Sequence, residues 1–226
     1  MKLAAVIKAR TLAFLDIHEL NRGGAIRFAD IVPKIVDRYG FLAFPEKFED
    51  FDFAEKGVVF HSGRLSDVVI DKLKIFSGVL YVETLSSTDD SQRVIIDMMT
   101  WGRDELGFTS GEEIIRNWAY VSQITFFSSL SMIRAASSPL DKLAAKTGAE
   151  VSKIFNETIV YHPLSITIGH DPSSRRNTVS SFLIQQRASV PFEDNKFFSE
   201  APLPTQIHLQ FLNELENDCV QMRGGW

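Results

Sequence analysis

The segment from Gly169 to Asn177 concentrates side chains that can carry chemistry. Within seven positions the chain places an imidazole, a carboxylate, a serine hydroxyl and two guanidinium groups, at His170, Asp171, Ser173, Arg175 and Arg176. Two neighbouring guanidinium groups can bind a carboxylate or a phosphate through paired hydrogen bonds. The glycine, proline and asparagine of this segment are typical of turns. We therefore predict an exposed loop between two antiparallel strands, and the alternatives are an anion or acidic-partner site or a catalytic loop.

A second unusual segment, residues 45–56, alternates aromatic and acidic side chains: Phe48, Glu49, Asp50, Phe51, Asp52 and Phe53. The rings either anchor their own loop or, if exposed together, form a patch that binds a partner. A calcium loop is disfavoured, because the series of alternating oxygen ligands would end at Ala54. The segment 191–200 repeats the Phe-Glu-Asp order. We predict partner contacts at Phe48, Phe51 and Phe53, together with His170, Asp171, Arg175 and Arg176.

Known catalytic and cofactor motifs are absent from the sequence. The chain has no phosphate-binding G-x-x-x-x-G-K-[ST], no G-x-G-x-x-G, no H-E-x-x-H and no G-x-S-x-G. Of the five histidines, only His170 has polar neighbours, whereas His208 lies on an apolar helix face and reads as a core residue. The single cysteine, Cys219, excludes an internal disulfide and is expected to be packed. We predict no cofactor, no metal and no assigned catalytic residue.

The composition is that of a globular protein. Of the 226 residues, 45% are hydrophobic and 23% are charged, and the formal net charge is −5. A negative balance disfavours nucleic acid as a partner, because binding to the phosphate backbone depends on clustered positive charge. The sequence has neither an apolar run long enough to span a bilayer nor a signal-peptide core. These features predict a soluble, cytoplasmic protein that does not bind membranes.

The periodicity of apolar residues predicts the elements that position the two segments. Strands are expected at 4–17, 41–44, 57–61, 68–84 with a break at Ser77-Gly78, 117–128, 159–168 and 178–190. Helices are expected at 26–39 and from Thr88, Ser138 and Thr205 onward. Alternate residues of a strand share a face, so Ile7, Leu15 and Ile17 are expected to be buried together on one face of the first strand. The order favours an α+β fold: a largely antiparallel mixed sheet with helices on one face.

We expect one globular domain over residues 1–226, with possible similar lobes at 1–108 and 109–226. The predicted function is a soluble, non-enzymatic protein-interaction or assembly module that binds a protein partner or a second copy of itself as a homo-oligomer. It would use the aromatic-acidic loops and the arginine loop. The alternative is an enzyme or sensor that binds a small anionic or phosphorylated ligand near residues 169–177.

Overall fold

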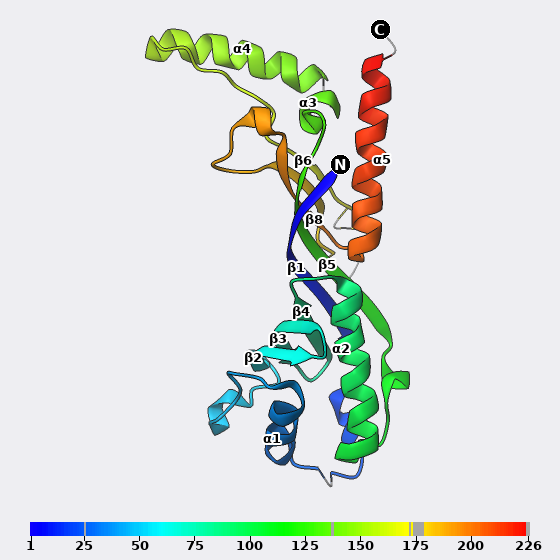
Figure 1. Cartoon of the computed structure of the whole chain (residues 1–226). Coiled ribbons are helices and arrows are strands. Elements are labelled where there is room, and N and C mark those ends of the chain that lie inside the picture. The colour runs from blue at the N-terminus through cyan, green and yellow to red at the C-terminus, as the bar shows by residue number, and fades with distance from the viewer. Residues whose placement is uncertain (25, 137, 172, 174–178, 225–226) are drawn as a thin grey trace. The chain divides into compact units, whose positions relative to one another are not determined.

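The computed structural model describes residues 1–24, 26–136, 138–171, 173 and 179–224 (Figure 1). The strands in these ranges are β1 Lys2–Phe14, β2 Val58–Leu65, β3 Val68–Ile75, β4 Val79–Thr84, β5 Asn117–Phe127, β6 Ser165–Ile168, β7 Phe182–Gln186 and β8 Lys196–Ala201. The α-helices are α1 Phe28–Tyr39, α2 Thr88–Trp101, α3 Met132–Ala136, α4 Ser138–Phe155 and α5 Thr205–Gly224.

The strands form one sheet in the order β2-β3-β4-β1-β5-β8-β7-β6. Strand β4 is antiparallel to both β1 and β3, β2 is antiparallel to β3, and β7 is antiparallel to both β6 and β8. An antiparallel sheet with helices that are not interleaved strand by strand is an α+β architecture. The predicted fold class is thus confirmed.

The chain divides into two compact units. The N-terminal unit contains Val6–Ser122 and Leu203–Thr205, and the C-terminal unit contains Met1–Ala5, Gln123–Pro202 and Gln206–Trp226. Strands β1 and β5 supply residues to both units. The single domain, with lobes at 1–108 and 109–226, stays a prediction.

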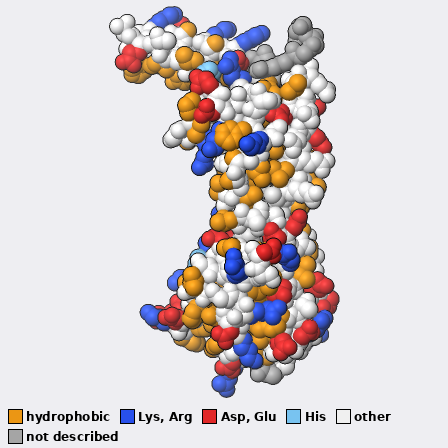
Figure 2. Space-filling model, in the orientation of Figure 1, with side chains coloured by type: hydrophobic (Ala, Val, Ile, Leu, Met, Phe, Trp, Pro, Cys, Tyr) orange, Lys and Arg blue, Asp and Glu red, His pale blue; other side chains and the backbone are white. Residues whose placement is uncertain are grey.

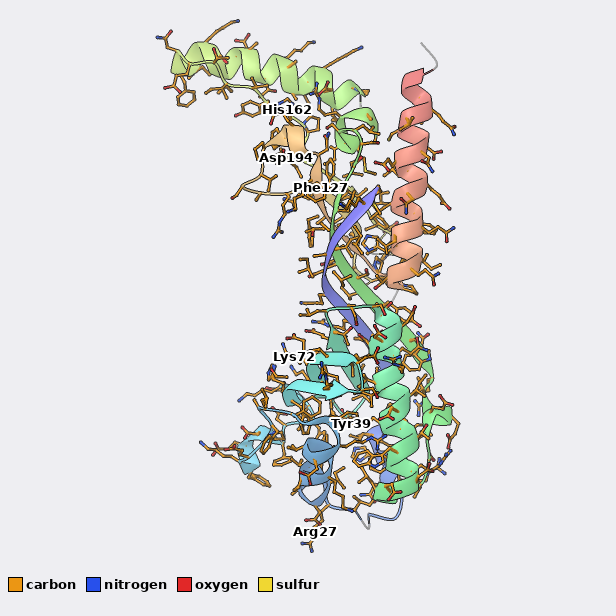
Figure 3. All side chains as sticks on the ribbon, in the orientation of Figure 1. Arg27, Tyr39, Lys72, Phe127, His162 and Asp194 are labelled. Carbon is orange, nitrogen blue, oxygen red and sulfur yellow. The ribbon has the colours of Figure 1, made fainter. Side chains whose placement is uncertain are left out.

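The core of the N-terminal unit lies between its strands and the helices α1 and α2. Helix α2 starts where the sequence predicts, and the Ser87 side chain caps it by accepting a hydrogen bond from the Asp90 N–H. Helices α1 and α2 are tied together by Asp97, which accepts a 2.6 Å bond from the hydroxyl of Tyr39 and two bonds from Arg38. Tyr39, labelled in Figure 3, is buried.

The first strand differs from its predicted pattern at both ends. Leu15 is buried, but Ile7 is 40% exposed and Ile17 is only half-buried. Strand β1 stops at Phe14, and Ile17 belongs to a 3-10 helix, so its side-chain direction no longer follows strand parity. The first turn of α2 covers Thr11, whose hydroxyl bonds the Thr88 carbonyl at 2.7 Å. Ile7 lies beyond that cover, so its predicted burial is wrong.

The C-terminal unit contains an element that the sequence did not reveal. Residues 196–201 form β8, with Phe197, Ser199 and Ala201 buried, rather than part of a loop. Helix α5 begins at Thr205 as predicted and buries His208, Leu212 and Cys219, whereas Phe211, predicted on the same face, is exposed. Of the predicted strand 159–168 only β6 forms, and of the described residues 179–190 only β7 does; residue 178 lies outside the described residues. The segment 41–44 makes only the bridge Ala43–His61.

Candidate functional site

The two strands that flank residues 169–177, β6 and β7, are antiparallel neighbours, as predicted. Strands β6 and β7 pair antiparallel, with Ile168 opposite Phe182. His170 and Asp171 are exposed, and Asp171 accepts hydrogen bonds from the Ser173 hydroxyl at 2.7 Å and the Ser173 N–H at 2.8 Å. Both bonds from Ser173 lower the pKa of Asp171, and the bond from the hydroxyl contributes most. Such local bonds are typical of turns. Arg175 and Arg176 lie outside the described residues, and the binding role of this loop stays a prediction.

The aromatic side chains of segment 45–56 are not equivalent. The ring of Phe51 meets that of Phe28 edge-on at a centroid distance of 5.9 Å, and Phe53 meets the same ring at 4.9 Å. Both are half-buried against α1, so they serve as anchors of their own loop. Phe48 is 93% exposed and is the ring of this segment that a partner could bury.

Two carboxylates of the same segment accept hydrogen bonds from the backbone of their own loop. Asp50 accepts bonds from the N–H groups of Glu46 and Lys47 at 3.0 and 2.9 Å. Asp52 accepts bonds from the N–H groups of Ala54, Glu55 and Lys56. These bonds hold the pKa of both carboxyl groups below the ordinary value, the Lys47 N–H contributing most for Asp50 and the Glu55 N–H for Asp52.

The C-terminal unit carries a projection that we call the arm, made of α4 and residues 157–164. The arm is held by Ser152, whose hydroxyl accepts a 2.9 Å bond from the Ile159 N–H and lies 2.7 Å from the Gly148 carbonyl. A side chain at Gly148 would meet the Ile159 carbonyl oxygen at 2.9 Å, so glycine permits the close approach of the returning chain. Residues 157–164 therefore pack closely against one face of α4.

Large apolar side chains remain exposed on the arm. They are 43–75% exposed and belong to Leu140, Leu143, Ile154, Phe155, Val160, Tyr161 and Leu164. Figure 2 shows hydrophobic side chains along α4, with Lys and Arg side chains beside them. The pairs Asp141–Arg134 and Glu150–Lys153 neutralise the two carboxylates of α4, while Lys142 and Lys146 are exposed. The segment 157–164 adds one further exposed carboxylate, Glu157. The arm thus combines apolar surface with two further exposed lysines on α4 and one exposed carboxylate beyond it.

An apolar cavity of about 350 Å³ lies inside the N-terminal unit. Its wall includes Phe28 and Phe53, and its polar side chains are His18, Asn21 and Ser77. The Asn21 amide is already committed, since it donates to the Ile26 carbonyl at 2.7 Å and accepts from the Ile26 N–H at 3.2 Å. The lining suits an uncharged apolar group, because a charge here would lose its hydration without gaining a partner. No sequence motif marks this cavity.

A second cavity, of about 380 Å³, lies in the C-terminal unit and is mostly polar. Its lining comes from three stretches far apart in the sequence: Ser129, Leu130, Ser131 and Arg134; His162 and Pro163; and Gln186, Phe192, Glu193 and Asn195. His162, labelled in Figure 3, belongs to the segment that returns from α4 and meets the Phe192 ring edge-on at 5.1 Å. We refer to this site as the polar cavity.

A buried carboxylate fixes one wall of the polar cavity. Glu216 on α5 accepts bonds from the Ser128 hydroxyl at 2.7 Å, the Ser129 N–H at 2.8 Å and the Ser129 hydroxyl at 3.1 Å, and it contacts the amino group of Met1. Burial acts to raise its pKa, but these donors outweigh burial and lower the pKa to about 2. Glu216 is thus an anionic anchor for residues 128 and 129.

The buried pair Ser199 and His208 does not form a catalytic dyad. The two side chains are 2.8 Å apart, but the Ser199 hydroxyl also lies 2.7 Å from the Leu183 carbonyl oxygen. A hydroxyl has one hydrogen, which the carbonyl takes, so His208 Nε2 must donate to Ser199. A histidine that donates to serine cannot accept its proton. Burial also lowers the pKa of His208 to about 4, which keeps the ring neutral.

The described residues contain neither a cluster of metal ligands nor a helix that could cross a membrane. Over the described ranges, three or more His, Cys, Asp or Glu side chains nowhere gather in a way that could hold a metal ion. None of the helices in the described part of the chain has a stretch long and apolar enough to cross a membrane. No protein-family model matches the chain, and no curated protein matches it.

Proposed function

We propose that this chain is a non-enzymatic protein-interaction or assembly module and that the arm is its main contact surface. The observation that carries the proposal is the set of exposed apolar side chains on α4 and the segment 157–164. Apolar surface gains about 25 cal/mol for each Å² removed from water, so exposed side chains of this kind favour a covered state. Exposed apolar patches commonly mark interaction sites.

The charges of the arm indicate the chemistry of the partner surface. Because the α4 carboxylates are paired within the chain while Lys142 and Lys146 are exposed, the part of the partner that meets α4 is expected to combine apolar side chains with flanking carboxylates. A second copy of this chain has an excess of carboxylates, since its formal net charge is −5. A cytoplasmic location is part of the proposal and is supported by the single cysteine, which suits a reducing compartment.

Removing two exposed side chains of the arm tests the interaction. We expect Ile154→Ser combined with Val160→Ser to reduce recovery of the bound protein from native extract at least about tenfold, because truncating well-packed anchors costs more than about 1 kcal/mol each. Light scattering of the purified variant reports self-association in the same way. The matched control, Leu42→Ser with Val69→Ser, changes two exposed side chains of the N-terminal unit and leaves recovery unchanged. Unchanged recovery with the arm variant, at an unchanged melting temperature, would contradict the proposal.

A further inference from the structure

The apolar cavity of the N-terminal unit lies inside the core of that unit. Its wall includes buried side chains from the sheet, from α1 and from α2, namely Ile75, Leu80, Ile31, Ile35, Met98 and Met99. Protein cores are close-packed and contain few spaces larger than a water molecule. A space of about 350 Å³ within a core is therefore exceptional, and its volume lies in the range of small-molecule sites.

The cavity reaches the surface beside the 3-10 helix Ile17–Asn21. His18, Gly24 and Ser77 line it and are exposed, so these residues form its rim. The N–H of Ile17 bonds to the carbonyl of Ser77 at 3.0 Å and ties two sides of the rim together. A side chain built on Gly24 would have no described neighbour within 4 Å beyond the adjacent residues. The rim therefore gives a small molecule access to the core without unfolding of the unit.

The wall of this cavity selects against a charged ligand. Among the described residues, it contains no Asp, Glu, Lys or Arg side chain. The amide of Asn21 is committed to the backbone, and His18 and Ser77 stand at the rim. A charged group inside would lose its hydration without gaining a counter-charge. An apolar group would instead exchange water for contacts with aliphatic side chains and with the rings of Phe28 and Phe53.

We propose that the apolar cavity binds one uncharged apolar small molecule, a hydrocarbon chain or ring system. The unbranched, polarisable side chains of Met98 and Met99 can adapt to ligands of different outline, as methionine does in other hydrophobic sites. The cavity belongs to the N-terminal unit, whereas the arm belongs to the C-terminal unit. Ligand binding in the cavity is thus independent of the interaction function proposed for the arm, and the two can fail separately.

The methionine methyl groups report on this site by nuclear magnetic resonance. Met98 and Met99 line the cavity, whereas Met132 is buried in the C-terminal unit and is an internal control. Protein labelled with ¹³C at the methionine methyl groups is titrated separately with toluene, 1-octanol and benzoate. We expect the Met98 and Met99 resonances to shift saturably with toluene or 1-octanol while Met132 stays in place. Benzoate, which resembles toluene in size but carries a charge, should leave all three in place. The absence of a saturable shift with both uncharged probes, a saturable shift with benzoate, or a parallel shift of Met132 would overturn the proposal.

The same substitution at two buried leucines tests whether the space exists and whether the ligand uses it. Leu80 lines the cavity, whereas Leu73 is buried in the same core but is not part of the wall. Leu80→Phe should keep or raise the melting temperature, because the larger ring has room, and should lower the affinity for the shifting probe at least about tenfold. The control Leu73→Phe should lower the melting temperature, because it overpacks a filled part of the core. An equal fall in melting temperature for both variants, or an unchanged affinity of Leu80→Phe, would overturn the proposal.

Discussion

Replacing Leu15 by alanine is expected to lower the free energy of unfolding by about 2–5 kcal/mol, whereas Ile7→Ala should cost less than about 1 kcal/mol. The two residues share parity on the first strand, but Leu15 is 5% exposed and Ile7 is 40% exposed. Leu15 packs in the core of the N-terminal unit, where its removal leaves a void that the surroundings cannot fully close. Ile7 loses less apolar burial because part of its side chain is already in water.

Urea unfolding of the two variants and the unmodified chain measures this difference. The comparison is matched, because both changes remove apolar atoms from the same stretch of chain, Ile7 on β1 and Leu15 one residue past its end. Equal costs at the two positions would mean that the cover over β1 extends to Ile7, and the exposure described above would be wrong.

His208 should make the protein less stable in mild acid. Burial lowers the pKa of the folded-state ring from 6.5 to about 4, so the unfolded chain binds a proton that the folded chain excludes. The resulting stability is fully present above pH 6.5 and is lost as the pH falls from 6.5 to about 4, a change of roughly 3 kcal/mol. The carboxylate of Glu216 on the same helix acts in a lower window, as the pH falls from 4.5 to about 2.

Urea unfolding at pH 7 and pH 4.5 gives the magnitude, and the imidazole resonances of His208 give the assignment. The variant His208→Gln should lose most of the pH dependence between these values while keeping a polar group near Ser199. A His208 ring that titrates near pH 6.5 in the folded protein would refute the buried, neutral assignment.

The sequence pattern predicted those features that depend only on residues close to them in the chain. The capped start of α2, the antiparallel pairing of β6 with β7 and the buried Cys219 follow from neighbouring residues and were predicted. Strand β8 was missed because its alternation, Phe197 and Ser199 against Phe198 and Glu200, follows a Phe-Glu-Asp segment that reads as a loop. The prediction that Ile7 is buried was wrong, because the first turn of α2 fixes where the covered part of β1 begins.

The candidate sites depend on contacts that sequence spacing does not encode. The wall of the polar cavity joins residues near 130, 162 and 190, and the wall of the apolar cavity joins residues of α1, α2 and the sheet. The spacing of Leu140 and Leu143 indicated an apolar face on α4. The sequence does not indicate whether another element covers that face. Phe51 and Phe53 were predicted as possible partner contacts, yet the Phe28 ring that anchors them lies outside their own segment.

The interaction function is tested most directly by photocrosslinking from a single aromatic position. A benzophenone side chain replaces Phe155 on the arm or, in a second variant, Phe48 on the aromatic-acidic loop, and both positions are exposed. Irradiation in native extract should yield a discrete crosslinked species from position 155, and Ile154→Ser with Val160→Ser in the same chain should reduce its yield at least about tenfold. A crosslink from position 48 with none from position 155 would contradict the assignment of the arm as the main contact surface.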